Sequence, residues 1–157
     1  MLGGMSDHPQ AIRMIDVGGK PVTPRTARAS ARLVAQSATV ARIRAGSLDK
    51  GDAVATARVA GIMAAKRTSD IVPLCHPLPL EAVEVAVSFP DATTVVVETR
   101  VRTTARTGVE MEALVAASAA ALTLYDMCKS IDPEMAVEWI RLEEKTGGVT
   151  GDFIRGA

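Results

Sequence analysis

Residues 83–101 read VEVAVSFPDATTVVVETRV. The first half has the two-residue period of a strand with one buried face, and its apolar positions are Val83, Val85, Val87 and Phe89. Residues 95–101 are rich in β-branched side chains, which favour extended backbone. Between the two halves, Pro90-Asp91-Ala92 is a turn signal, because proline fixes φ and aspartate accepts local backbone hydrogen bonds. We therefore predict a β-hairpin.

Helices are predicted on both sides of this hairpin. The longer one runs from about Val109 to Lys129 and is apolar nearly all round, which predicts a buried element; its apolar side chains include Leu114, Val115, Ala119, Ala120, Ala121, Leu122, Leu124 and Tyr125. The helix before the hairpin begins after Gly51, with Asp52 as its N-cap. Gly61 in its interior predicts a close contact between this helix and neighbouring backbone.

Residues 26–35 are compatible with two structures. Their alanine content favours a helix, whereas the alternation of arginine and serine with apolar residues favours a strand. We choose the strand, because Ser37 can then cap a short helix that reaches about Arg44. Residues 136–144 alternate in the same way and form the last strand. The order strand, two helices, two strands, helix, strand predicts an α+β fold of the ferredoxin-like kind, an antiparallel sheet with helices packed on one face.

Composition narrows the class of protein. A chain of 157 residues that is 48% hydrophobic fits one domain, over residues 13–157, behind a flexible N-terminus over residues 1–12. The 18 basic residues balance 18 acidic ones and only 3% are aromatic, which argues against nucleic acid or an anionic membrane as partner. No apolar run approaches the roughly 20 residues of a membrane span, and residues 1–16 lack a signal-peptide core. We expect a cytoplasmic protein in which Cys75 and Cys128 are reduced.

Residues 66–78, KRTSDIVPLCHPL, place His76 between two prolines, just after Lys66 and Arg67. Prolines restrict φ and remove backbone donors, so His76 is expected on a stiff, non-helical segment. A histidine can exchange a proton near neutral pH, and adjacent cations can hold an anion. This combination indicates a functional site.

Three further clusters each have a structural and a functional interpretation. Lys50, beside the N-cap, is either a surface lysine or part of a phosphate site. Glu110 and Glu112 open the long helix, where they complement its dipole or bind a donor-rich ring. Asp126 and Lys129 lie three residues apart at its end, either as a structural ion pair or as a pair whose partial burial poises the lysine for proton transfer.

Two further lysines and the histidine–cysteine pair complete the candidates. Lys145 precedes a glycine-rich segment, residues 146–152, that is either a turn-rich end or a phosphate clamp. Lys20 is expected to be an ordinary surface lysine. One His–Cys pair without further ligands cannot fill a tetrahedral zinc site, so no metal site is predicted.

Glu112 and Asp126 are 14 residues apart on the long helix, which separates them by roughly 20 Å. They cannot both touch one small ligand within a protomer. If both clusters serve one site, that site is completed across a subunit interface, and we expect an oligomer.

Taken together, the motifs resemble the cyclic pyranopterin monophosphate synthases of molybdenum cofactor biosynthesis, the MoaC family. The matching segments are Met14-Ile15-Asp16-Val17, Lys50-Gly51-Asp52, Ala55-Thr56-Ala57-Arg58, Ala60-Gly61-Ile62, residues 64–68, residues 73–78, residues 107–114, residues 124–129 and residues 145–152. They follow the family's order and cover about Met14 to Phe153.

The resemblance implies a single catalytic domain over residues 13–157, a ferredoxin-like fold and a homohexamer built as a trimer of dimers, with sites at subunit interfaces. It implies a lyase that converts the cyclised dihydroguanosine triphosphate to cyclic pyranopterin monophosphate and releases pyrophosphate. No redox cofactor is needed, although Mg²⁺ could accompany the triphosphate.

The resemblance also implies roles for particular residues. The active-site aspartate falls on Asp126 and the essential lysines on Lys50 and Lys129, with His76 assisting in proton transfer. The family's substrate-contacting residues fall on Leu74, Cys75, His76, Met111 and Glu112. From the chemistry of paired carboxylates we expect Glu110 to contact substrate as well. Displacing pyrophosphate needs charge stabilisation, and the cations available for it are Lys66, Arg67, Arg25 and Lys145. A proton-shuttling lysine would need a pKa depressed by burial or by neighbouring cations.

Two rival functions follow from the same residues. One is a non-catalytic regulator that binds a nucleotide or pterin without turnover. The other is a nucleotide pyrophosphohydrolase, which would need bound metal and would act on ordinary GTP.

Overall fold

The structure is a computed structural model that describes residues 11–157. The flexible N-terminus expected over residues 1–12 therefore lies largely outside the described residues. The strands are β1 (Thr23–Val34), β2 (Ala82–Asp91), β3 (Thr94–Ala105), β4 (Ala136–Thr146) and β5 (Phe153–Ile154). The helices are α1 (Ser37–Ala45), α2 (Ala53–Ala65), α3 (Thr68–Ile71) and α4 (Glu110–Cys128). The strands form one antiparallel sheet in the order β2-β3-β1-β4-β5, which confirms the α+β class.

The hairpin is the pair β2–β3, with Val85 opposite Thr99. Its turn lies slightly later than predicted, at residues 92–93, where the Asp91 carboxylate accepts a hydrogen bond from the Thr93 amide at 2.9 Å. Residues 26–34 are indeed a strand: β1 occupies the middle of the sheet and pairs with β3 and β4. The extended backbone is favoured because alternate residues of β1 face two different environments.

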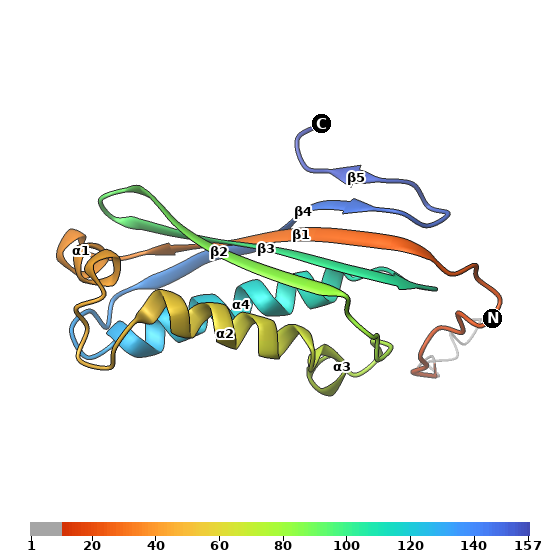
Figure 1. Cartoon of the computed structure of the whole chain (residues 1–157), viewed down its shortest axis with the longest axis horizontal. Coiled ribbons are helices and arrows are strands. Elements are labelled where there is room, and N and C mark those ends of the chain that lie inside the picture. The colour runs from red at the N-terminus through yellow and green to blue at the C-terminus, as the bar shows by residue number, and fades with distance from the viewer. Residues whose placement is uncertain (1–10) are drawn as a thin grey trace, which may run out of the picture.

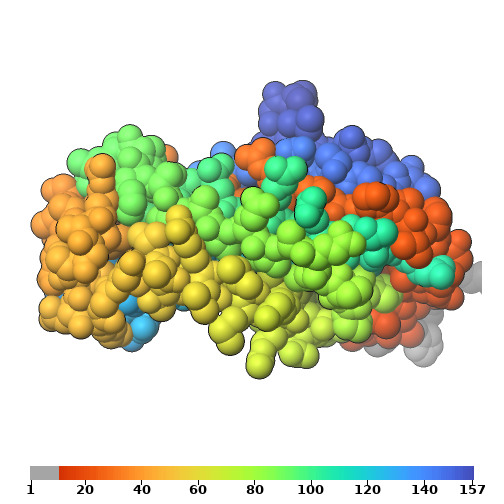
Figure 2. Space-filling view, viewed as in Figure 1, coloured from red at the N-terminus to blue at the C-terminus, as the bar shows by residue number. Residues whose placement is uncertain are grey.

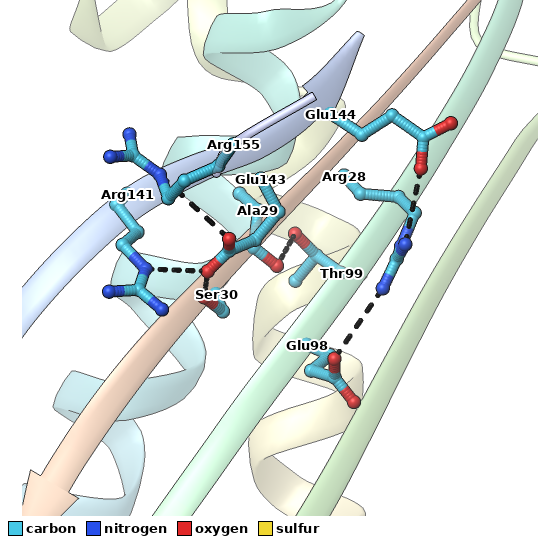
Figure 3. Close-up of polar contacts among 9 residues, drawn as sticks. All are labelled: Arg28, Ala29, Ser30, Glu98, Thr99, Arg141, Glu143, Glu144 and Arg155. Carbon is cyan, nitrogen blue, oxygen red and sulfur yellow. Dashed lines mark hydrogen bonds and ion pairs between the residues drawn. The ribbon is translucent and has the colours of Figure 1, made fainter. Parts of the chain in front are cut away.

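One face of β1 is covered and the other is charged. Its buried side chains Ala27, Ala29 and Ala31 are each at most 1% exposed. On the open face, Arg28 pairs with Glu98 at 3.6 Å and with Glu144 at 3.1 Å, contacts that are drawn in Figure 3. These cross-strand pairs satisfy the charges of a face without helices.

Helices α2 and α4 lie side by side under the covered face (Figure 1), where α4 packs on β1, β3 and β4. Small side chains allow this close packing; on α4 the residues at 0% exposure include Ala113, Ala116, Ala117, Ala120 and Ala121. The predicted close contact at Gly61 is also present. A Cβ there would lie 3.1 Å from the Ala116 carbonyl oxygen of α4 and 3.0 Å from a methyl group of Val85.

Several sequence predictions were wrong in detail. Ser37 is the first residue of α1 rather than its cap; Gln36 caps the helix without a side-chain hydrogen bond. Helix α4 is not buried all round, because Leu122 is 62% exposed. By length and composition alone α4 is apolar enough to cross a membrane, but half of its apolar window is buried inside the domain, as in the core helix of a folded domain. The short elements α3 and β5 were not anticipated.

Candidate functional site

Asp126 lies in the last turn of α4 and holds two lysines. The ammonium of Lys129 lies 2.7 Å from its Oδ1, and that of Lys50 lies 3.1 Å from its Oδ2. The Lys50 ammonium also donates to the backbone carbonyl of Asp126 at 3.1 Å. The structure thus joins Lys50 to the pair Asp126 and Lys129, which the sequence placed in a separate cluster. We call Lys50, Asp126 and Lys129 the lysine–aspartate cluster.

The local backbone explains how Lys50 reaches Asp126. Gly51 donates its amide to the Leu48 carbonyl at 2.9 Å and has φ 106°, a conformation that favours glycine. This tight turn precedes α2, whose first turn is capped by Asp52 as predicted: its carboxylate accepts from the Ala55 amide at 3.0 Å. Lys50 is therefore held between two ordered helices, α1 and α2.

The electrostatics of this cluster differ from the expectation. Hydrogen bonds from Lys129 and then Lys50 lower the pKa of Asp126. The hydrogen bond to Asp126 raises the pKa of Lys129 rather than depressing it. Both side chains are more than half exposed, so burial opposes their charges less than the hydrogen bonds favour them. The depressed pKa that a proton-shuttling lysine would need is therefore not found at Lys129 in the single chain, because the ion pair with Asp126 outweighs desolvation.

A cavity of about 300 Å³ lies at the other end of α4. Its lining residues are Ile15, Val17, Lys20, Leu74, Cys75, His76, Leu78, Thr107, Gly108, Glu110, Met111 and Glu112. The loop after α3 supplies Leu74, Cys75 and His76, and the first turn of α4 supplies Glu110, Met111 and Glu112. The residues predicted to contact substrate therefore share one cavity.

Two carboxylates line this cavity in different states. Glu110 forms an ion pair with Lys145 at 3.3 Å. Glu112 is only 4% exposed, and burial, followed by the charge of Glu110, raises its pKa. Burial and then the charges of Glu112 and Glu110 raise the pKa of the Cys75 thiol as well. Cys75 therefore stays protonated and contributes packing rather than a thiolate nucleophile.

The other predicted cations are distributed unevenly. Arg25 lies against the glycine-rich segment that follows Lys145: a Cβ at Gly148 would lie 2.6 Å from its guanidinium. Lys66 and Arg67 follow directly on α2 and are not among the residues that line the cavity. Lys20 does line it, although the sequence marked it as an ordinary surface residue; the only local signal was the turn-forming run Asp16-Val17-Gly18-Gly19 before it.

The lysine–aspartate cluster and the cavity stay apart within one chain. Glu112 and Asp126 lie near opposite ends of the continuous helix α4, as the sequence predicted. Over residues 11–157, no group of three or more His, Cys, Asp or Glu side chains is placed to hold a metal ion. Cys75 and Cys128 are not joined by a disulfide.

The sequence of this chain is similar to those of known proteins. The profile of the MoaC family matches residues 14–148 of this sequence. The chain belongs to the MoaC family. Among its relatives, the cyclic pyranopterin monophosphate synthase of Brevibacillus brevis is 53% identical, over 92% of this chain and 90% of the relative. The protein of the same name from Herpetosiphon aurantiacus is 53% identical, over 98% and 93%, and that from Streptomyces avermitilis is 52% identical, over 95% and 87%. Both the lysine–aspartate cluster and the cavity fall inside the region that matches the MoaC family.

Proposed function

We propose that this protein is a cyclic pyranopterin monophosphate synthase of molybdenum cofactor biosynthesis. It converts the cyclised dihydroguanosine triphosphate to cyclic pyranopterin monophosphate and releases pyrophosphate. The observation that carries this proposal is the convergence of Lys50 and Lys129 on the Asp126 carboxylate in a chain of the MoaC family. Rearranging a purine nucleotide to a pterin needs proton transfers at ring and sugar atoms, and this cluster provides both donors and an acceptor.

The proposed site combines the two ends of α4 from different subunits. Asp126, Lys50 and Lys129 of one subunit would meet His76 and Glu112 of another, because one chain holds them at opposite ends of a helix. The exposed outer surface of α2, yellow in Figure 2, supports assembly: Val59 and Met63 are 56% and 50% exposed. We propose a homohexamer, a trimer of dimers, in the cytoplasm, with residues 13–157 as its single catalytic domain.

Within this site we assign catalysis to Asp126, Lys50 and Lys129, with His76 assisting. The substrate is held by the cavity residues Leu74, Cys75, Met111, Glu110 and Glu112. Glu112 contacts the guanine-derived ring, because a carboxyl group can pair with the N–H donors of that ring. Four cations, Arg25, Lys66, Arg67 and Lys145, stabilise the charge of the departing pyrophosphate. The chemistry is proton transfer and phosphate displacement, so we propose that no redox cofactor is required and that Mg²⁺ accompanies the triphosphate at most.

Turnover of the cyclised dihydro-GTP tests the proposal. The full chain is incubated with this substrate, and pyrophosphate and the fluorescence of the oxidised pterin are followed together. Both products should appear, and Lys50→Ala and Lys129→Ala should each lower kcat by about 10²-fold or more. Binding without turnover would identify a regulator instead. Release of pyrophosphate from ordinary GTP in a metal-dependent reaction would identify a pyrophosphohydrolase.

A further inference from the structure

The residues before β1 have no helix or strand, yet they form part of the cavity wall. Over residues 11–22 the chain has only a turn at residues 18–20. Within it, the Asp16 carboxylate accepts from the Gly18 amide at 2.8 Å, and the Lys20 amide donates to the Val17 carbonyl at 3.0 Å. Val17 and Lys20 both line the cavity. The position of this segment, which we call the N-terminal arm, therefore shapes the site.

One side chain attaches the N-terminal arm to the sheet. Arg106, which follows the last residue of β3, donates from one guanidinium nitrogen to the carbonyls of Gly18 and of Lys20, the latter at 3.0 Å. Its own carbonyl accepts from the Arg25 guanidinium at 3.3 Å. Arg106 thus joins the N-terminal arm to the start of β1 and the end of β3. Its two hydrogen bonds to the arm hold the carbonyl before Gly19 and the carbonyl of Lys20, so the backbone is fixed on both sides of the Gly19–Lys20 peptide bond.

Lys20 is a cation of the cavity wall that has no ion-pair partner among the described residues. The other charged or titratable groups that line it are Cys75, His76, Glu110 and Glu112, and the raised pKa of the Cys75 thiol keeps it uncharged. Glu110 is already paired with Lys145, and the buried Glu112 carboxyl holds its proton more tightly than an exposed one. Among the ion pairs formed within residues 11–157, none involves Lys20. Its ammonium is thus available to an anionic ligand.

We propose that Lys20 is a further substrate-binding residue, which contacts the phosphate chain of the substrate, and that Arg106 is a positioning residue that holds the N-terminal arm so that Lys20 faces the cavity. This inference rests on the proposed function for the identity of the substrate. An ammonium is well suited to a phosphate because it acts as a compact charge with three donors.

Steady-state kinetics on the full chain tests Lys20 first. Lys20→Ala should raise KM for the cyclised dihydro-GTP by about 10- to 100-fold, the effect of one charge-assisted hydrogen bond, and should change kcat by less than about threefold. Lys20→Arg should retain most of the affinity. Arg100→Gln removes one exposed positive charge from the open sheet face and should leave KM unchanged. An unchanged KM in Lys20→Ala would overturn the proposal.

A double-mutant cycle then tests Arg106. If Arg106 acts through Lys20, Arg106→Ala should raise KM by about the same factor as Lys20→Ala. The KM of the double variant should then be no higher than that of Lys20→Ala alone. Independent, multiplicative effects on KM would contradict a positioning role. Thermal unfolding of each variant shows whether the fold is intact; because Lys20 is exposed, its variant tests the binding role even if Arg106→Ala unfolds.

Calorimetry with inorganic pyrophosphate separates this inference from the proposed function. Wild-type protein should bind pyrophosphate, and Lys20→Ala should bind it about 10-fold or more weakly. If the wild type does not turn over the cyclised substrate but its binding of pyrophosphate depends on Lys20, the proposed function is wrong and Lys20 still belongs to an anion-binding site. If turnover is normal but neither KM nor pyrophosphate binding depends on Lys20, the inference fails and the function stands.

Discussion

The Asp126 carboxylate holds two ammonium groups at 2.7 and 3.1 Å, and its charge is what keeps them there. Asp126→Asn preserves the shape of the side chain but removes the charge, so both lysines lose their partner. We expect kcat to fall by about 10²- to 10⁴-fold, the range for a lost acid–base group. Asp49→Asn is a matched control, because the Asp49 side chain is 97% exposed and its ion pair is formed with Arg42. Near-normal turnover in Asp126→Asn would remove Asp126 from the mechanism.

Glu112 gives a prediction about stability and pH. Burial raises its pKa in the folded protein, so the folded state binds more protons than the unfolded state between the ordinary and the raised pKa values. The contribution of Glu112 to the free energy of unfolding therefore decreases as the pH rises through that interval. Glu112→Gln removes the titration, and its Tm relative to wild type should increase as pH is raised from 4 to 8, the range of the measurement. A constant difference in Tm would show that Glu112 does not titrate abnormally.

At this residue scale the sequence predicted which side chains lie together better than it predicted their electrostatics. Asp126 and Lys129 were recognised as a pair from their spacing. That Lys50 joins them depends on a turn at Gly51 that brings together residues 76 positions apart in the sequence. The pKa of Lys129 depends on exposure, which spacing does not reveal. The place of Lys20 in the cavity wall was missed because the arm that carries it is hydrogen-bonded to Arg106, 86 positions away in the sequence.

At the scale of elements, Gly61 is the closest point between α2 and α4. Gly61→Ala would place a methyl group 3.1 Å from the Ala116 carbonyl oxygen, a backbone atom that cannot move without shifting α4. The gain in helix propensity, about 1 kcal/mol, is opposed by overpacking, about 1–3 kcal/mol. We expect a net loss of stability, measured by urea unfolding. Ala55→Ser, in the exposed first turn of α2, should change stability by less than about 0.5 kcal/mol; a Gly61→Ala variant as stable as wild type would show that the helices can separate.

The elements themselves follow from the sequence where the pattern extends over many residues. The hairpin, β1, α2 and α4 were predicted because alternation or an apolar face persists over ten or more positions. Helix α3 has four residues and strand β5 has two, too few for any period to be visible. Ser37 was misassigned because serine is favourable both as a cap and in the first turn, and only the backbone of Gln36 decides between them.

At the scale of the whole molecule, the proposed composite site can be tested by mixing subunits. Asp126→Asn damages one end of α4 and Glu112→Gln the other, so neither homo-oligomer should be active. In mixed oligomers assembled from equal amounts, about a quarter of the sites would combine two intact halves. We expect that fraction of wild-type turnover from co-expressed, doubly tagged protein.

Mixing two variants damaged at the same end is the control for that experiment. Asp126→Asn with Lys129→Ala should restore nothing, because every site would contain at least one damaged cluster. Absence of restoration in the first mixture would place the complete site within one chain. Restoration in this control would show that the Asp126 and Lys129 of one site come from different subunits, and would contradict the lysine–aspartate cluster as one half of the site.

Helix α4 also sets which changes in length the chain can accept. An extra residue inside it would turn everything beyond the insertion by about 100° and advance it by about 1.5 Å. The face that carries Asp126 would then point away from Lys50, while Glu112 would keep its place in the cavity. An extra residue in the exposed turn between β2 and β3 would disturb neither end. The length of α4 therefore sets the spacing between the two halves of the proposed site. A deletion or insertion scan should find that single-residue changes in α4 abolish activity, whereas changes in the turn between β2 and β3 are tolerated.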